Sequence, residues 1–185
     1  MKKPYQIYDL PIPDDDHKMA YVMERDKLNF ESSKIWIYIG ADVKDPTFAK
    51  VGMTMSDLST RSTSTGNSNY FLFCAFQCYH GTSAEQVREI ERGAQQYLDY
   101  MFGEDKRGRF PETNRPSECY YGINFEDFFF HLHEYLWEHQ IRHFPTSCYV
   151  SSDDPNWEYG SAISWLFNDI VPLHVRKHYL NLIIK

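Results

Sequence analysis

The chain has 185 residues, of which 42% are apolar and 17% aromatic, and its formal net charge is −7. A chain of this length with so many large side chains can bury a substantial core, which excludes a mostly disordered protein. No apolar run reaches the ~18–20 residues of a membrane span, so we expect no transmembrane segment. No apolar stretch follows the first residues either, so we expect a cytoplasmic protein with reduced cysteines.

The charges are unevenly distributed along the chain. Residues 33–122 carry 10 basic and 11 acidic groups, whereas residues 123–185 carry 4 and 8. The overall negative charge argues against a broad basic surface for nucleic acid. A local phosphate-binding face remains open within the near-neutral segment, because it holds the basic cluster Lys106, Arg107, Arg109 and Arg115.

The first 33 residues are expected to form an N-terminal arm with a short helix over 17–28. Prolines and the run Asp14-Asp15-Asp16-His17 precede that helix. Carboxylates beside a histidine suggest metal ligands, but aspartates before a helix are more often solvated capping residues, which is the interpretation preferred here.

The next segment predicts a small sheet. Residues 35–39 form an apolar run that ends at Gly40, and residues 48–53 follow a polar loop, so the two segments predict an antiparallel hairpin. A short helix is expected from Asp57 to about Thr63, because Ser56 stands where an N-cap should be. The aromatic run 70–79 predicts a central strand.

Helices dominate the remaining prediction. The apolar spacing predicts a helix over 84–102, a polar loop over 103–118 and a short strand over 119–121. Further helices are predicted over 125–144, 157–169 and 172–184. The fold class is therefore α+β: a mainly antiparallel three-stranded sheet flanked by helices in residues 34–122, with residues 123–185 as a helical extension packed on it.

Four residues of the middle segment have side chains suited to phosphodiester hydrolysis. Tyr38 and Lys50 lie on the two strands of the predicted hairpin, Arg61 on the short helix, and Glu91 on the following long helix. A carboxylate can hold a divalent metal, an arginine can stabilise charge on phosphorus, and a phenol or amine can activate water. Taken singly, each of the four also has an ordinary structural role, in packing or on the solvated surface.

The order of these segments resembles the GIY-YIG endonuclease superfamily, specifically its phage-type branch, over about residues 34–122. The resemblance is carried by short motifs in sequence order: Ile35-Trp36-Ile37-Tyr38-Ile39, Lys50-Val51-Gly52-Met53-Thr54, Ser56 to Arg61, Ser64-Thr65-Gly66-Asn67, Ile90-Glu91-Arg92-Gly93-Ala94, and Ser117-Glu118-Cys119-Tyr120. In place of the second-motif tyrosine stands Lys50, as in some restriction-type members.

The resemblance implies a metal-dependent DNA endonuclease. Tyr38, helped by Lys50, would take the proton from water, Arg61 would stabilise the charge on phosphorus, and Glu91 would bind Mg²⁺ or Mn²⁺. An unperturbed tyrosine has a pKa near 10, so we expect the charges of Lys50 and Arg61 to lower the pKa of Tyr38. Glu85 and Glu89 are the rival carboxylates on the same helix.

Two other classes of function stay open. A catalytically inactive GIY-YIG-like protein that binds or inhibits a host protein would fit the acidic charge and the replaced motif positions. A structural or interaction domain unrelated to nucleases is the third class. The expected partners are DNA, a second copy of the chain in a homodimer, or a host protein, with no membrane.

A cluster of histidines suggests a zinc site: His131, His133, His139 and His143. No HExxH motif is present, so surface and packing roles are preferred.

Overall fold

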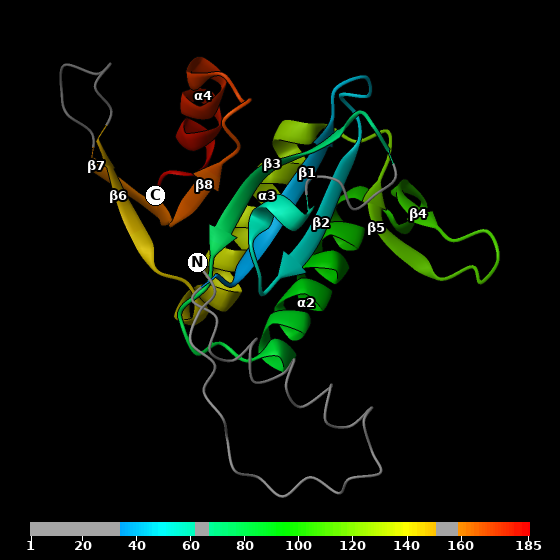
Figure 1. The fold of residues 1–185 in the computed structure, drawn as a ribbon, viewed down its shortest axis with the longest axis horizontal. Coiled ribbons are helices and arrows are strands. Elements are labelled where there is room, and N and C mark those ends of the chain that lie inside the picture. Colours follow the sequence, from blue (N-terminus) through cyan, green and yellow to red (C-terminus); the bar gives the residue numbers. More distant parts are fainter. Residues whose placement is uncertain (1–33, 62–66, 151–158) are drawn as a thin grey trace, which may run out of the picture.

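The computed structural model describes residues 34–61, 67–150 and 159–185. Within these residues the main sheet has six antiparallel strands in the order β4-β5-β2-β1-β3-β8 (Figure 1). The strands span Trp36–Asp42 (β1), Ala49–Thr54 (β2), Tyr70–Gln77 (β3), Arg107–Arg109 (β4), Pro116–Tyr120 (β5) and Trp165–Phe167 (β8). A separate two-stranded ribbon consists of β6 (Thr146–Val150) and β7 (Tyr159–Ile163).

Three α-helices and three 3-10 turns complete the described part of the chain. The α-helices are α2 (Ala84–Phe102), α3 (Phe125–Gln140) and α4 (Leu173–Ile183), and the turns are η1 (Leu58–Arg61), η2 (Glu104–Lys106) and η3 (Ile141–His143). Helix α2 begins with a capping box, in which Ser83 and Gln86 bond each other's backbone amides. Asn124 caps α3 in a similar way, because its side chain accepts from the amides of Glu126 and Asp127.

The predicted α+β class, the hairpin and the helix over 84–102 are confirmed. Strands β1 and β2 pair antiparallel from Trp36 opposite Thr54 to Ala41 opposite Ala49, with Tyr38 opposite Gly52. The predicted helix at residues 17–28 and the acidic run 14–17 lie outside the described residues, as do residues 62–66 at the end of the predicted short helix.

Several sequence expectations are wrong. The sheet has six strands instead of three, because β4 and β5 extend it beyond β2, and β8 extends it beyond β3. The segment 103–118, expected to be a loop, contains η2, β4 and the start of β5. Within the range 157–169, where a helix was expected, residues 159–163 form β7, which pairs with β6, and residues 165–167 form β8, which pairs with the open edge of β3. Strand pairing therefore outweighs the local helical spacing. Residues 123–185 are therefore not helical throughout.

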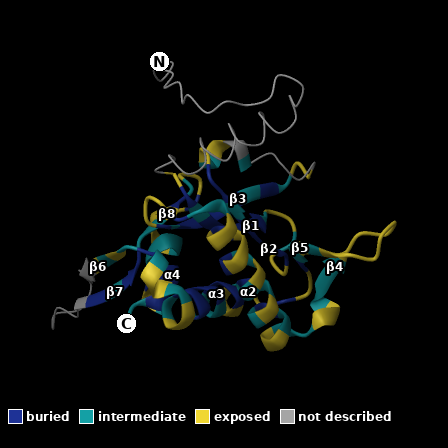
Figure 2. Cartoon of the chain, turned by 90° about the horizontal axis from the view of Figure 1, so that it is seen from below, coloured by how far each residue is buried: buried dark blue, intermediate teal, exposed yellow. Residues whose placement is uncertain are grey.

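The main core lies between the sheet and helices α2 and α3. In Figure 2 the buried residues gather where the strands face these helices, while the β4–β5 loop is exposed. Phe73 of β3 sits at the centre of an aromatic cluster, with ring centroids 4.8–6.1 Å from those of Phe125, Phe129, Phe167 and Tyr179. The late segments α3, β8 and α4 thus help to form the same core as the first strands. None of the helices in the described ranges is long and apolar enough to cross a membrane.

Candidate functional site

The candidate site lies where the sheet presents Tyr38. Successive strand residues point to opposite faces. Ile37 and Ile39 of β1 belong to the main core, whereas Tyr38 belongs to a second small cluster with Leu72 and Ala75 of β3. Tyr38 is only 2% exposed. The tyrosine is therefore held by the sheet on the face away from the main core.

Two glycines make room for tyrosine rings on this face. A Cβ atom at Gly52 would lie 2.6 Å from Cζ and Oη of Tyr38, and one at Gly40 would clash with the ring of Tyr70. Gly52 is the cross-strand partner of Tyr38, and Gly40 is the partner of Lys50. The glycine of the second motif therefore serves a close approach, in which the phenol of Tyr38 lies directly over the β2 backbone.

Lys50 connects the tyrosines to an acidic group on the neighbouring strand. Its Nζ atom lies 6.0 Å from the ring centroid of Tyr38 and 5.8 Å from that of Tyr70. The same atom lies 3.1 Å from Oε2 of Glu118 on β5. The lysine side chain is 11% exposed and that of Glu118 is 48% exposed, so the ion pair runs from the buried sheet toward solvent.

Glu91 reaches the same place from helix α2. Its carboxylate accepts a backbone hydrogen bond from Met53 and interacts electrostatically with Glu118, Lys50 and Arg61. Met53 pairs with Ile37 of β1 on one edge of β2. On the other edge, β5 pairs with β2 only at Ala49 and Lys50, so the Met53 amide lies beyond that pairing and bonds Glu91 of α2. The rival carboxylates Glu85 and Glu89 are exposed on the outer side of α2. The structure thus brings Glu91 into the group and leaves its rivals outside it.

Arg61 completes the group as the last residue of η1. It is partly buried, and its charge acts on both Tyr38 and Glu91. All four residues singled out in the sequence therefore lie within electrostatic reach of one another, although they come from β1, β2, η1 and α2. The approach of η1 to this face is supported by Leu58, which packs against the small Tyr38 cluster.

The site strongly perturbs the ionisation of its carboxyl group. Burial, followed by the nearby charge of Glu118, raises the pKa of Glu91 from its ordinary value of 4.5 to about 7. The Met53 hydrogen bond and the charges of Lys50 and Arg61 offset this only in part. A carboxyl group that ionises near neutral pH beside a second carboxylate is typical of functional sites.

The expected lowering of the tyrosine pKa is wrong. Lys50 and Arg61 do favour the ionised phenol, but burial outweighs them and raises the pKa of Tyr38 above its ordinary value of 10.0. Burial lowers the pKa of Lys50, yet the acidic neighbours Tyr38 and Glu118 outweigh it, and the net pKa is raised. Both groups are therefore protonated at neutral pH in the protein as it stands.

The donor set at Glu91 fits a hydrated divalent cation better than a fully caged one. No group of three or more histidine, cysteine or carboxylate side chains that could hold a metal occurs in the described segments. Mg²⁺ usually keeps several waters and binds through one or two carboxylates together with substrate phosphate. A cation at Glu91 would also relieve the repulsion between this carboxylate and Glu118, so the residues present suit Mg²⁺ or Mn²⁺.

Two site residues were not identified from the sequence. Glu118 appeared only within the closing motif of the family resemblance, with no chemical role. Tyr70 appeared only within an aromatic run, yet its ring lies beside Lys50, and its buried Oη has no hydrogen-bond partner among the described residues. The sequence signal that points to Tyr70 is Gly40, because a glycine in a strand interior often marks a close approach.

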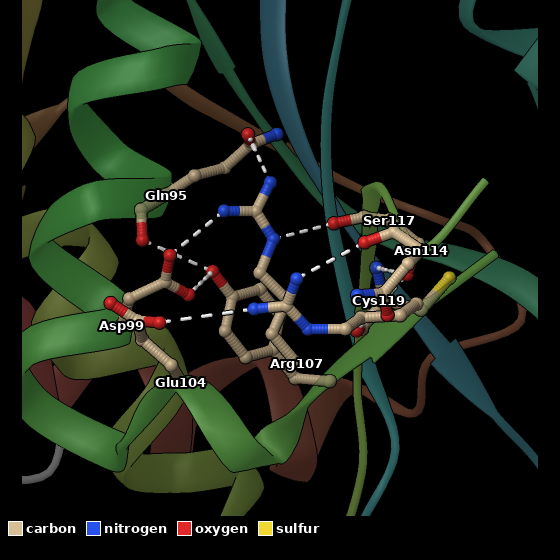
Figure 3. Close-up of polar contacts among 9 residues, drawn as sticks. Gln95, Asp99, Glu104, Arg107, Asn114, Ser117 and Cys119 are labelled. Atoms are coloured by element: carbon tan, nitrogen blue, oxygen red, sulfur yellow. Dashed lines mark hydrogen bonds and ion pairs between the residues drawn. The ribbon is translucent and has the colours of Figure 1, made fainter.

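The basic cluster of residues 106–115 has mainly a structural use at Arg107. Figure 3 shows this guanidinium donating to Asp99 Oδ2 at 2.8 Å, to Gln95 Oε1 at 2.6 Å and to the carbonyl of Ser117 at 2.6 Å. The side chains of Arg107 and Asp99 are 11% and 18% exposed, and Tyr120 Oη also donates to Asp99 at 2.8 Å. Arg107 therefore anchors the base of the β4–β5 ribbon to α2 and is not available to bind phosphate.

The histidines of α3 serve packing and surface contacts. His131 lies 3.3 Å from Glu134, and His139 contacts the rings of Tyr97 and Tyr135. His133 is buried, accepts from the amide of Ile163 at 3.2 Å, and has its pKa lowered by burial to about 3. Packing and surface contacts therefore account for His131, His133 and His139.

Comparison of the chain with family models, with curated proteins and with solved structures finds no match.

Proposed function

We propose that the chain is a cytoplasmic, metal-dependent DNA endonuclease of the GIY-YIG type. The observation that supports this most is the convergence of Tyr38, Lys50, Arg61 and Glu91 at one place on the sheet, from four separate elements. These four residues are the ones to which the family resemblance assigns catalytic and metal-binding roles. Glycines that admit the tyrosine rings, and a carboxyl group poised near neutral pH, add to the support.

Each residue has a defined task in this proposal. Glu91, held by the Met53 amide, binds Mg²⁺ or Mn²⁺, which when bound stabilises negative charge on the leaving oxygen. Arg61 stabilises the charge that develops on the phosphoryl oxygens. Tyr38 and the ammonium of Lys50 donate hydrogen bonds that orient the attacking water and the phosphate. Because both groups are protonated, their task is positioning, and the proton must leave by another route.

A nicking assay on supercoiled plasmid, with modified and unmodified phage DNA as further substrates, tests the proposal. We expect cleavage with Mg²⁺ or Mn²⁺ that EDTA abolishes. Glu91→Ala should abolish cleavage while leaving the fold and DNA binding nearly intact, and Arg61→Ala should slow it by about 10²-fold or more. Glu89→Ala is the matched control, because Glu89 lies exposed on the same helix. Equal cleavage by Glu91→Ala and wild type would show that the activity lies elsewhere.

A binding or inhibitor protein of the same shape is the second candidate. The raised pKa values of Tyr38 and Lys50 and the net charge of −7 favour it, because they describe an acidic chain whose tyrosine and lysine hold their protons at neutral pH. Such a protein would cut no DNA with either metal, yet would capture a defined host protein. The plasmid assay therefore separates the two candidates.

A further inference from the structure

We propose that Glu118 accepts the proton of the attacking water, with the Lys50 ammonium holding its carboxylate in place. This inference rests on the proposed endonuclease function and deepens it. The supporting geometry is the 3.1 Å contact between Lys50 Nζ and Glu118 Oε2 beside the ring of Tyr38. An ionised carboxylate is an acceptor only, so it can take a proton without first losing one.

The backbone places Glu118 at the opening of the site. Strands β2 and β5 pair at Ala49 with Tyr120 and at Lys50 with Cys119, and their pairing ends there. Glu118 is the next residue of β5, at the point where the two strands separate and α2 approaches β2. The carboxylate of Glu118 influences the ionisation of Tyr38, Tyr70 and Glu91, so it lies within electrostatic reach of each.

The other groups of the site are less suited to this task. Tyr38 and Lys50 have raised pKa values and hold their protons at neutral pH. Glu91 is the more buried carboxylate and is assigned to the metal. Glu118 is half exposed, so its carboxyl group can pass a proton on to solvent after each turnover. The lysine side chain beside it is nearly buried, which keeps the ion pair in one geometry.

The chemical step balances without any redox partner. An O–H bond of water breaks, its proton moves to a carboxylate oxygen of Glu118, and the water oxygen forms a bond to phosphorus. The bond from phosphorus to the leaving oxygen breaks, and its electron pair stays on that oxygen, which then takes a proton from solvent. Glu118 returns its proton to solvent, so the net reaction is hydrolysis of one phosphodiester bond.

The decisive variant is Glu118→Gln. Glutamine keeps the shape of the side chain and an oxygen that accepts a hydrogen bond from Lys50, but it cannot accept the proton of the attacking water. At saturating Mg²⁺ we expect kcat on plasmid to fall by roughly 10²–10⁴-fold, the usual contribution of general acid–base catalysis. The dissociation constant for DNA should change less than about threefold. The acid limb of the pH profile of kcat, measured at saturating Mg²⁺, should disappear, because glutamine has no carboxylate to accept the proton of water.

Two further arms separate proton transfer from a structural role. Glu118→Ala should regain activity when formate or acetate is added, whereas a residue that only positions Lys50 would show no such rescue. Glu118→Asp keeps a carboxylate and should retain a pH-dependent rate. The matched control is Glu112→Gln, because Glu112 lies exposed in the loop of the same ribbon and should leave the rate unchanged.

The possible failures are distinguishable. If wild type cleaves DNA and Glu118→Gln cleaves within about threefold with the same pH profile, Glu118 is not the acceptor, and the endonuclease proposal stands. If Glu118→Gln fails to fold, the absence of formate or acetate rescue in folded Glu118→Ala overturns the inference. If wild type cleaves nothing with either metal, the proposed function fails, and the role of Glu118 fails with it.

Discussion

Replacing Glu91 by glutamine should stabilise the metal-free protein at neutral and alkaline pH. The pKa of this carboxyl group rises from 4.5 to about 7 on folding, so the folded protein holds a proton that the unfolded chain releases. The free energy of unfolding of wild type therefore falls as pH rises from about 4.5 to about 7, and it stays low above that range. Glutamine removes this loss, because it is neutral throughout and can still accept from Met53.

The size of the effect follows from the two pKa values. At ~1.4 kcal/mol for each tenfold change in the ionisation constant, the charged form of Glu91 costs the fold about 3 kcal/mol above pH 7. For a chain of this length, that free energy corresponds to a Tm difference of roughly 6–12 °C. The difference in the free energy of unfolding between Glu91→Gln and wild type should therefore widen by about 3 kcal/mol between pH 4.5 and pH 8.

Urea unfolding followed by circular dichroism, in EDTA at both pH values, measures the gap. Glu89→Gln serves as the control and should show a gap that barely changes with pH, since Glu89 is exposed on the same helix. Adding Mg²⁺ at pH 8 should stabilise wild type but not Glu91→Gln. A gap that stays constant from pH 4.5 to 8 would refute the reasoning, because it would mean that Glu91 is as well solvated as in the unfolded chain.

Three further predictions concern the surroundings of the site and its metal. Gly52→Ala should lower the free energy of unfolding by ~1–3 kcal/mol and slow plasmid cleavage at least ~tenfold, because the new Cβ displaces the ring of Tyr38. Asp99→Ala should cost about 3 kcal/mol in urea unfolding, because it leaves the nearly buried Arg107 guanidinium without its ion pair. The affinity for Mg²⁺, measured by calorimetry, should fall about tenfold per pH unit below pH 7, as protons compete for Glu91.

Local patterns were enough to predict the part of the site that local structure controls. The apolar run over 35–39 and the polar loop after it predicted the β1–β2 hairpin, and helical spacing predicted the orientation of α2, which turns Glu91 inward and Glu89 outward. Tyr38 and Lys50 followed from the hairpin. These features depend on residues close together in the sequence, where periodicity is informative.

The rest depends on contacts between distant segments, which a periodic pattern does not reveal. β8 becomes a strand because β3 leaves an edge open, and Glu118 meets Lys50 because β5 returns beside β2. The direction in which the fold shifts the pKa of Tyr38 was predicted wrongly for a related reason. Neighbouring charges can be guessed from spacing, whereas the burial that outweighs them is known only once the whole sheet is assembled.

The aromatic cluster around Phe73 has a consequence for the order in which the chain acquires its structure during synthesis. Phe73 lies in β3, yet the rings around it come from α3, β8 and α4, so they leave the ribosome much later. Until then the apolar side of the first strands has no complete cover. Closure of long loops before stable packing slows folding, and exposed strand edges invite association in the meantime. The nascent chain therefore acquires its site only after α4 has been translated, and chains that stop before α4 should aggregate instead of folding.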